Sequence, residues 1–255
     1  MSDELPSARI RPYNGADADE RKTVMRLIAK HEMEALATAN RRAYCNPALL
    51  LLWLAVSSAF VEFMHWWPSQ QPAGLGGLWP WFSPIRGYAP FLVVSLVAVD
   101  WFNRPYFEER MQAVLRSEDI RDGSSLWLLE YDDEIIGLAA IKTRKAKDTQ
   151  ETSIVADLTH FTVIEPYRPA KIQRDLLQHT LRKAFEANDK LVLIHAEDNA
   201  LHPYIQQALY DEGFRVTDGT ALRTMGVMRW KIRDSTLIKG EWERRQADTA
   251  KGSAG

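Results

Sequence analysis

The sequence predicts an α+β protein in which a mixed, mostly antiparallel sheet flanked by helices is interrupted by an inserted two-helix transmembrane hairpin. The first observation is that short segments of alternating apolar and polar residues are separated by longer segments with helical spacing. The second is that two apolar runs lie close together between residues 47 and 102. The third is that six of the nine tryptophans fall in or beside these runs: Trp53, Trp66, Trp67, Trp79, Trp81 and Trp101.

This pattern divides the chain into four parts. Residues 1–46 hold the first strand and helix of the sheet domain, residues 47–102 form the hairpin, and residues 103–238 form the remainder of the domain. Residues 239–255 are charged and rich in small side chains, so we expect a disordered tail there.

The amino-terminal part begins with a strand and continues into a long helix. Ala8–Tyr13 alternates in the manner of a short strand. Ala16–Arg42 then carries apolar residues at positions compatible with a helix: Val24, Leu27, Ile28, Met33 and Leu36. A helix of this kind packs its apolar side on the sheet.

Each apolar run is long enough to cross a bilayer. As helices, Pro47–Trp67 would extend about 31 Å and Ile85–Phe102 about 27 Å. The linker between them is rich in proline, glycine and aromatic residues, and it holds almost no cations. Arg41 and Arg42 precede the first run and Arg104 follows the second, so the positive-inside bias places both ends in the cytosol. The alternative is that both runs are buried core helices of a soluble protein.

The remainder of the chain alternates between short strands and helices. A short helix is expected at Tyr106–Leu115, and Leu126–Tyr131 and Ile135–Thr143 form a predicted β-hairpin across the turn Asp132-Asp133. The later elements are a strand at Thr152–Ile164, a helix at Lys171–Asn188, a strand at Leu191–Ala196, a helix at Pro203–Gly213 and one or two strands within Arg215–Ile232.

Composition excludes some classes of function. The net charge is −2 and basic residues are spread along the chain, so we expect no nucleic-acid partner. Cys45 is the only cysteine, and no Cys/His spacing fits a zinc site. His195 and His202 flank two acidic residues, but their spacing matches no metal template, so we interpret them as structural and expect no metal.

The order of elements, with an apolar hairpin between the first long helix and the first antiparallel strands, resembles the GNAT superfamily over residues 8–47 and 103–232. Within that superfamily the chain is similar to the membrane-bound N-acetyltransferases of the endoplasmic reticulum. The resemblance rests on the opening strand Ile10-Arg11-Pro12-Tyr13 and on His160 and Val163 in the segment THFTV. It implies a GNAT-like sheet, residence in the endoplasmic reticulum or another endomembrane, and a domain that faces the cytosol.

The resemblance also implies acetyl-CoA as the co-substrate and an amine as the acceptor. Thr162 and Val163 would offer their backbone to the pantetheine, and Arg168 and Lys171 would hold the pyrophosphate. The family pattern in this loop has Arg or Gln, two free positions, Gly, one free position and Gly or Ala. Arg168 and the apolar Ile172 fit. Lys171 replaces the first glycine, and its ammonium could compensate; the alternative is that Lys171 is a surface charge and the loop no longer binds CoA.

Two further residues are candidates for proton transfer. His160 titrates in the useful range and its place matches the family, so it is the first candidate for the general base, ahead of Asp157 and Glu165. The alternative is a core histidine with a satisfied hydrogen bond. The family's general acid is a tyrosine four residues before a Gly-Phe pair, whereas Tyr210 stands three residues before Gly213. Because one residue turns a helix by about 100°, Tyr210 would point elsewhere unless the helix is locally shortened.

Two functions follow. The first is a membrane-anchored N-acetyltransferase that acts on a protein lysine, an N-terminus or a small amine conjugate. The second is a catalytically degenerate GNAT-fold protein that serves as a chaperone or packaging adaptor for a membrane-protein client. In the second, Glu62, Asp100 and the small residues of the first run would face the client.

Overall fold

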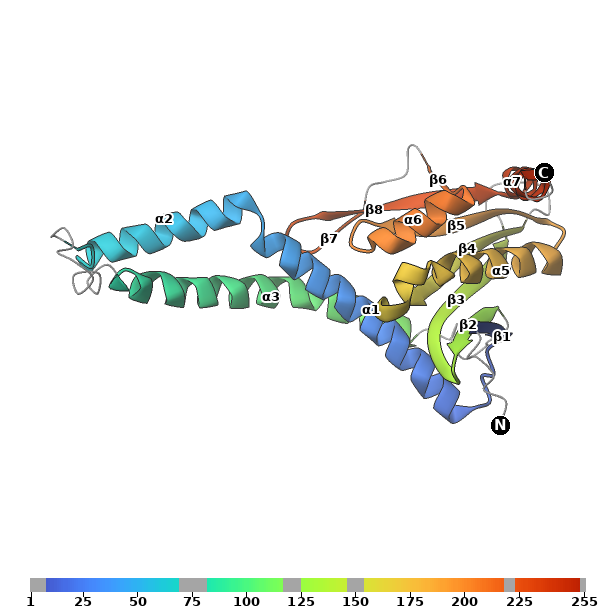
Figure 1. Cartoon of the computed structure of the whole chain (residues 1–255), viewed down its shortest axis with the longest axis horizontal. Coiled ribbons are helices and arrows are strands. Elements are labelled where there is room, and N and C mark those ends of the chain that lie inside the picture. The colour runs from blue at the N-terminus through green and yellow to red at the C-terminus, as the bar shows by residue number, and fades with distance from the viewer. Residues whose placement is uncertain (1–7, 69–81, 117–124, 146–153, 218–222, 253–255) are drawn as a thin grey trace.

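The structure, a computed structural model, describes residues 8–68, 82–116, 125–145, 154–217 and 223–252. Its centre is an eight-stranded sheet in the order β1-β2-β3-β4-β5-β8-β6, with β7 paired to β8 (Figure 1). The strands are β1 (Ala8–Pro12), β2 (Leu126–Tyr131), β3 (Glu134–Lys145), β4 (Ile154–Val163), β5 (Leu191–Asn199), β6 (Arg215–Val216), β7 (Arg223–Met225) and β8 (Trp230–Ile238). Every pair is antiparallel except β4 and β5. The predicted mixed, mostly antiparallel sheet is confirmed.

The predicted turn between β2 and β3 forms as expected. Asp132 and Asp133 both have a positive φ, 50° and 60°. Two left-handed residues in a two-residue turn match the twist of the flanking strands, and aspartate tolerates this conformation better than most side chains.

Helices cover both faces of the sheet. α5 (Ile172–Ala187) and α6 (Pro203–Glu212) pack on one face, where Leu176, Leu181 and Leu209 meet β-strand side chains such as Ile136. α1 (Ala18–Tyr44) packs on the other face through Val24, Leu27 and Ile28. Alternate residues of β2 and β3 therefore enter different cores, which is the period of a strand buried on both sides.

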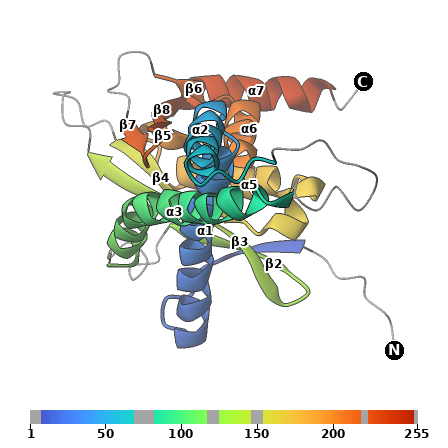
Figure 2. The ribbon, with the colours of Figure 1, turned by 90° about the vertical axis from the view of Figure 1, so that its left-hand side faces the viewer.

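Helices α2 (Pro47–Phe63) and α3 (Ile85–Arg116) pair and extend away from the sheet, and Figure 2 views the molecule from the far end of this pair. They pack closely, because a Cβ added at Gly87 would lie 2.4 Å from Cγ2 of Val61. By length and composition α3 could cross a membrane; α2 passes the same test only together with α1, from which it is bent by 58°. Only 6% of the apolar window of α3 is buried, so the buried-core alternative does not describe it.

Two expectations differ from the structure. α3 is one helix through Pro90 and Pro105, whereas we expected a separate helix at Tyr106–Leu115. Packing explains the continuity, since the buried Phe107 holds this part of the helix against α1 and β8. The expected disordered tail instead contains α7 (Lys239–Gly252), whose Trp242 ring lies 5.1 Å from that of Phe185.

Candidate functional site

The parallel strands β4 and β5 pair along only part of their length. Their ladder runs from Ile154 opposite Leu191 to Leu158 opposite Ala196. Beyond this point β4 continues beside β3 and β5 continues beside β8. The carboxyl-terminal half of β4 therefore borders a split in the sheet, with backbone groups directed toward the gap rather than to β5.

Three cavities follow this split. The η2 groove, of about 770 Å³, lies between α1, the 3₁₀ helix η2 (Glu165–Ala170) and the start of α6. The α3 groove, of about 450 Å³, is lined by residues of α3, β4, β5, β7 and β8. A throat of about 60 Å³ shares His202 with the η2 groove and His160 with the α3 groove. The throat thus shares lining residues with both grooves.

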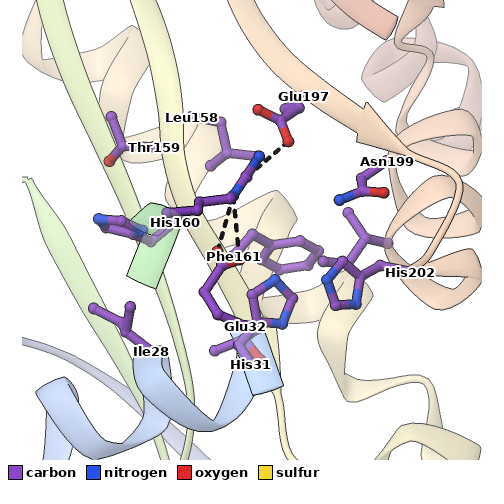
Figure 3. A pocket seen from close by; sticks show the side chains of 13 residues that line it. Ile28, His31, Glu32, Leu158, Thr159, His160, Phe161, Glu197, Asn199 and His202 are labelled. Atoms are coloured by element: carbon purple, nitrogen blue, oxygen red, sulfur yellow. Dashed lines mark hydrogen bonds and ion pairs between the residues drawn. The ribbon is translucent and has the colours of Figure 1, made fainter. Parts of the chain in front are cut away.

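An ion triad crosses the throat. Arg110 of α3 lies 2.7 Å from Glu197 of β5 and 3.2 Å from Glu32 of α1, contacts that are drawn in Figure 3. Burial raises the pKa of Glu32, and the charge of Arg110 opposes this shift. The guanidinium therefore neutralises a carboxylate that would otherwise be buried without a partner.

Two histidines stack on the other side of the throat. The ring centroids of His31 and His202 are 3.9 Å apart and their planes differ by 18°. Burial is the main cause that lowers the pKa of both, to about 3 for His202, and the nearby Arg110 lowers both further. Both imidazoles are therefore neutral at physiological pH.

Tyr204 of α6 lies beside this pair. Its hydroxyl is 3.3 Å from the Thr162 hydroxyl and 3.4 Å from Nδ1 of His31. Burial raises the pKa of Tyr204. The phenol is therefore protonated and can donate a proton at the edge of the η2 groove, which it lines.

Arg168 is partly buried and is held by three contacts. Its Nε donates to the carbonyl oxygen of Val163 at 2.7 Å, and its guanidinium pairs with Glu34 and lies 3.9 Å from the centroid of the Tyr204 ring. Arg168 lines the η2 groove, and the predicted pyrophosphate contact would require its guanidinium to leave these partners. The Val163 carbonyl would then become available at the split.

Lys171 occupies a backbone conformation that suits glycine. Its φ is 57°, and it caps the start of α5 without a side-chain hydrogen bond. Only glycine adopts this region without steric cost, and glycine is the residue that the resemblance leads one to expect here. Ile172 is the first residue of α5 and packs against the core beneath that helix.

The structure places the predicted site residues in different surroundings. His160 lines the throat, and Figure 3 shows its imidazole on the opposite side of the pocket from His31 and His202. Thr162 and Val163 are buried at the split. Tyr210 is 74% exposed and lines another cavity, near Asp198 and Arg233. The assigned roles of these residues stay predictions.

Sequence reasoning missed Tyr204, Arg110 and His31, and it interpreted His202 as structural. Tyr204 could have been found from its place in the first turn of the helix that follows β5, where parallel strands direct their carboxyl ends toward a ligand. The described residues contain no group of three or more His, Cys, Asp or Glu side chains able to hold a metal ion. His195 pairs with Thr236 within the sheet, while His202 precedes α6.

A sheet that splits between two parallel strands and has helices on both faces defines a GNAT-like α/β domain. Residues 95–209 match the model of the Acetyltransferase (GNAT) family. The match begins in α3, ends in α6 and contains both strands of the split; it spans less than half of the chain. No curated protein matches the sequence.

Several solved structures are similar. The NatC complex bound to Gag peptide and CoA aligns with 8% identity and a TM-score of 0.48, covering 91% of this chain and 98% of that one. A putative acetyltransferase of the GNAT family from Desulfovibrio desulfuricans aligns with 11% identity and a TM-score of 0.42, covering 91% of this chain and 99% of that one. Arabidopsis thaliana Naa50 in complex with a bisubstrate CoA analogue aligns with 18% identity and a TM-score of 0.39, covering 47% of this chain and 76% of that one. At these scores the likenesses assign no substrate to this chain.

Proposed function

We propose that the protein is a membrane-anchored N-acetyltransferase that transfers an acetyl group from acetyl-CoA to an amine. The observation that carries this proposal is the split between β4 and β5, with a groove on each side and a throat that carries His160 and borders Tyr204. A thioester donor would enter from the η2 groove and an amine from the α3 groove. The GNAT family match over both strands supports the same reaction class.

The η2 groove fits the chemistry of acetyl-CoA. It is lined by three arginines, Arg41, Arg42 and Arg168, which suit a ligand with several phosphates. The Val163 carbonyl lies at the split and already accepts a hydrogen bond from a side chain. It would accept one from a pantetheine amide once Arg168 turns toward the phosphates.

Acetyl transfer forms a C–N bond, breaks a C–S bond, and requires one proton to leave the amine and one to reach the thiolate. His160 lines the α3 groove and would accept the amine proton. Tyr204 lines the η2 groove and would give its proton to the thiolate. Tyr204 therefore replaces Tyr210 as our candidate acid, because Tyr210 lies outside all three cavities of the split.

We further propose that α2 and the first half of α3 anchor the domain in a membrane, because their large apolar side chains are exposed. Arg41, Arg42 and Arg104 lie where the hairpin joins the sheet domain, which favours a cytosolic domain. The endoplasmic reticulum or another endomembrane is proposed from the resemblance described above. Acceptors of the proposed reaction are a protein lysine, an N-terminus or a small amine conjugate.

One observation favours the second candidate function, a degenerate GNAT-fold adaptor for a membrane-protein client. The guanidinium of Arg168 is already paired with Glu34 and stacked on Tyr204, and Lys171 stands in a position that suits glycine. A client would contact the hairpin, where Glu62 is exposed. Asp100 is less suited to that role, since it accepts hydrogen bonds from Asn40 and Arg104.

Titration calorimetry of the detergent-solubilised protein with acetyl-CoA distinguishes the acetyltransferase from the adaptor. Saturable binding that is lost with Arg168→Ala plus Lys171→Ala supports the acetyltransferase, and absence of binding at millimolar acetyl-CoA contradicts it in favour of the adaptor. With an amine that releases CoA, Tyr204→Phe should lower kcat by about 10²-fold or more while binding is kept. Tyr210→Phe is the matched control and should leave kcat unchanged; the reverse result would restore Tyr210 as the acid.

A further inference from the structure

The turn between β7 and β8 combines exposed apolar and basic side chains. It runs Gly226-Val227-Met228-Arg229 and continues into Trp230 and Lys231. Val227 is 50% exposed, and Arg229 and Lys231 are also exposed. The proposed transfer reaction uses none of these residues, yet their combination is typical of segments that lie in the headgroup region of a membrane.

Hydrogen bonds fix this turn to the base of the hairpin. The backbone N–H of Val227 donates to Oδ1 of Asn103 in α3 at 2.9 Å. Asn103 is fully buried and in turn donates to Asn40 of α1, which donates to Asp100. The turn is therefore held at a defined level along α3 (Figure 1).

That level coincides with the expected edge of the hydrocarbon. The helix from Ile85 to Trp101 rises about 24 Å, close to the thickness of a thin bilayer core. Trp101 and Phe102 are strongly exposed at its end, as expected for aromatics at the headgroup level. Asn103 follows at once, so the turn bonded to it lies at the same boundary.

Basic groups from another element surround the turn. Arg41 and Arg42 are in the last turn of α1, and the guanidinium of Arg42 lies 5.6 Å from the centroid of the Trp230 ring. Arg41 and Arg42 at the end of α1 and Arg229 and Lys231 at the β7–β8 turn are together called the basic collar. Such a collar is complementary to the phosphates of an anionic leaflet.

We propose that the β7–β8 turn is a second membrane contact, in which Val227 and Met228 enter the headgroup layer while Arg229 and Lys231 bind anionic lipid phosphates. This inference rests on the proposed membrane anchoring. Because β8 pairs with β5, the contact would fix the split relative to the bilayer. The η2 groove, which Arg41, Arg42 and Cys45 line, would then open at the membrane surface.

The test uses three valines of similar exposure. In a Cys45→Ser background, Val227→Cys, Val93→Cys and Val192→Cys are each labelled with the fluorophore NBD and reconstituted in vesicles of phosphatidylcholine and phosphatidylserine. Val93 lies in the middle of the hairpin at 58% exposure, and Val192 lies on β5 at 45%. We expect quenching by acyl-chain spin labels at 93, by headgroup spin labels at 227 and by neither at 192.

Charge removal provides the second measurement. Each basic residue near an anionic surface changes the docked-to-undocked ratio about fivefold, so Arg229→Gln plus Lys231→Gln should lower this ratio at 227 about 25-fold. Lys190→Gln plus Arg215→Gln, two exposed basic positions outside the collar, should leave this ratio unchanged.

Three results of the labelling experiment would contradict the proposal. Quenching at 93 without quenching at 227 overturns the second contact and keeps the anchor. A probe at 93 that reports water overturns the anchor itself, and a shielded probe at 227 that no lipid label quenches indicates a protein partner and also overturns the proposal.

Discussion

The hairpin and the sheet domain place polar and apolar groups in opposite ways. In the hairpin, valines and leucines such as Val93 face outward. In the sheet domain the core contains carboxylates, including Glu32 at 5% exposure and Glu212 at 3%. Helix α3 belongs to both regions, because its first half exposes apolar residues and its second half buries Phe107 and supplies Arg110. One continuous helix thus exposes apolar side chains in one half and buries them in the other.

Polar groups and apolar groups differ in whether they need a partner when they are removed from water. An α-helix satisfies its backbone hydrogen bonds internally, so a helix with apolar side chains needs no further polar partners. A buried carboxylate is tolerated only when it is paired. Glu32 meets Arg110, and Glu212 accepts from Arg174 and Gln178. The interior of the sheet domain should therefore be more sensitive to loss of a charge than the base of the hairpin.

The largest expected effect tests this sensitivity. Arg110→Ala leaves Glu32 and Glu197 without their shared partner and should lower the free energy of unfolding by about 3 kcal/mol. Arg104→Ala removes an exposed bridge to Asp100 and should cost less than about 1 kcal/mol. Chemical unfolding of both variants in detergent measures the difference, and equal losses would contradict the comparison.

A charge placed on an apolar surface should distinguish the two regions almost as strongly. Val93→Arg in mid-hairpin should disfavour membrane insertion by about 3 kcal/mol. Val192→Arg on the exposed side of β5 should change stability by no more than about 0.5 kcal/mol. Glycosylation mapping of insertion for the first variant and thermal unfolding for the second provide the measurements. Unimpaired insertion of Val93→Arg would argue against a lipid-facing helix.

The stacked histidines predict a pH dependence that belongs to the sheet domain. Their folded pKa values lie below the ordinary value of 6.5, so below that pH the unfolded chain binds protons that the folded protein does not. Stability is full above pH 6.5 and falls as the pH drops toward 3. For His202 alone the loss between pH 6.5 and 5 should be about 2 kcal/mol.

Unfolding of the protein across this pH range measures the slope. The double variant His31→Asn plus His202→Asn lacks both groups and should show a flatter profile. If its slope equals that of the unchanged protein, other groups cause the pH dependence.

The smallest effect concerns the loop that precedes α5. Lys171→Gly removes the backbone strain of a non-glycine residue in the left-handed region and should stabilise the protein. The gain should be no more than about 1 kcal/mol, because glycine also adds conformational freedom to the unfolded chain. Lys190→Gly, in another loop, is the control and should give no stabilisation. Destabilisation by Lys171→Gly would show that the lysine side chain makes a contact worth more than the strain.

Local pattern was sufficient for most elements of the fold. The alternation in Leu126–Tyr131 and the spacing in the helix that became α5 depend only on neighbouring residues, and both elements formed where they were predicted. The site was less accessible to this reasoning. Tyr210 was chosen by counting back from Gly213, whereas Tyr204 reaches the split because α6 begins directly after β5.

The mixed sheet, the apolar hairpin and the strand that carries His160 could be predicted from the amino-acid pattern, because hydrophobic periodicity and run length are local properties. Which side chains meet at the split depends instead on the packing of distant elements. Glu34 and Arg168 are 134 residues apart, and His31 and Tyr204 are 173 apart. Such pairs depend on how α1, β4 and α6 pack together, and packing between distant elements leaves no signature in the spacing of neighbouring residues.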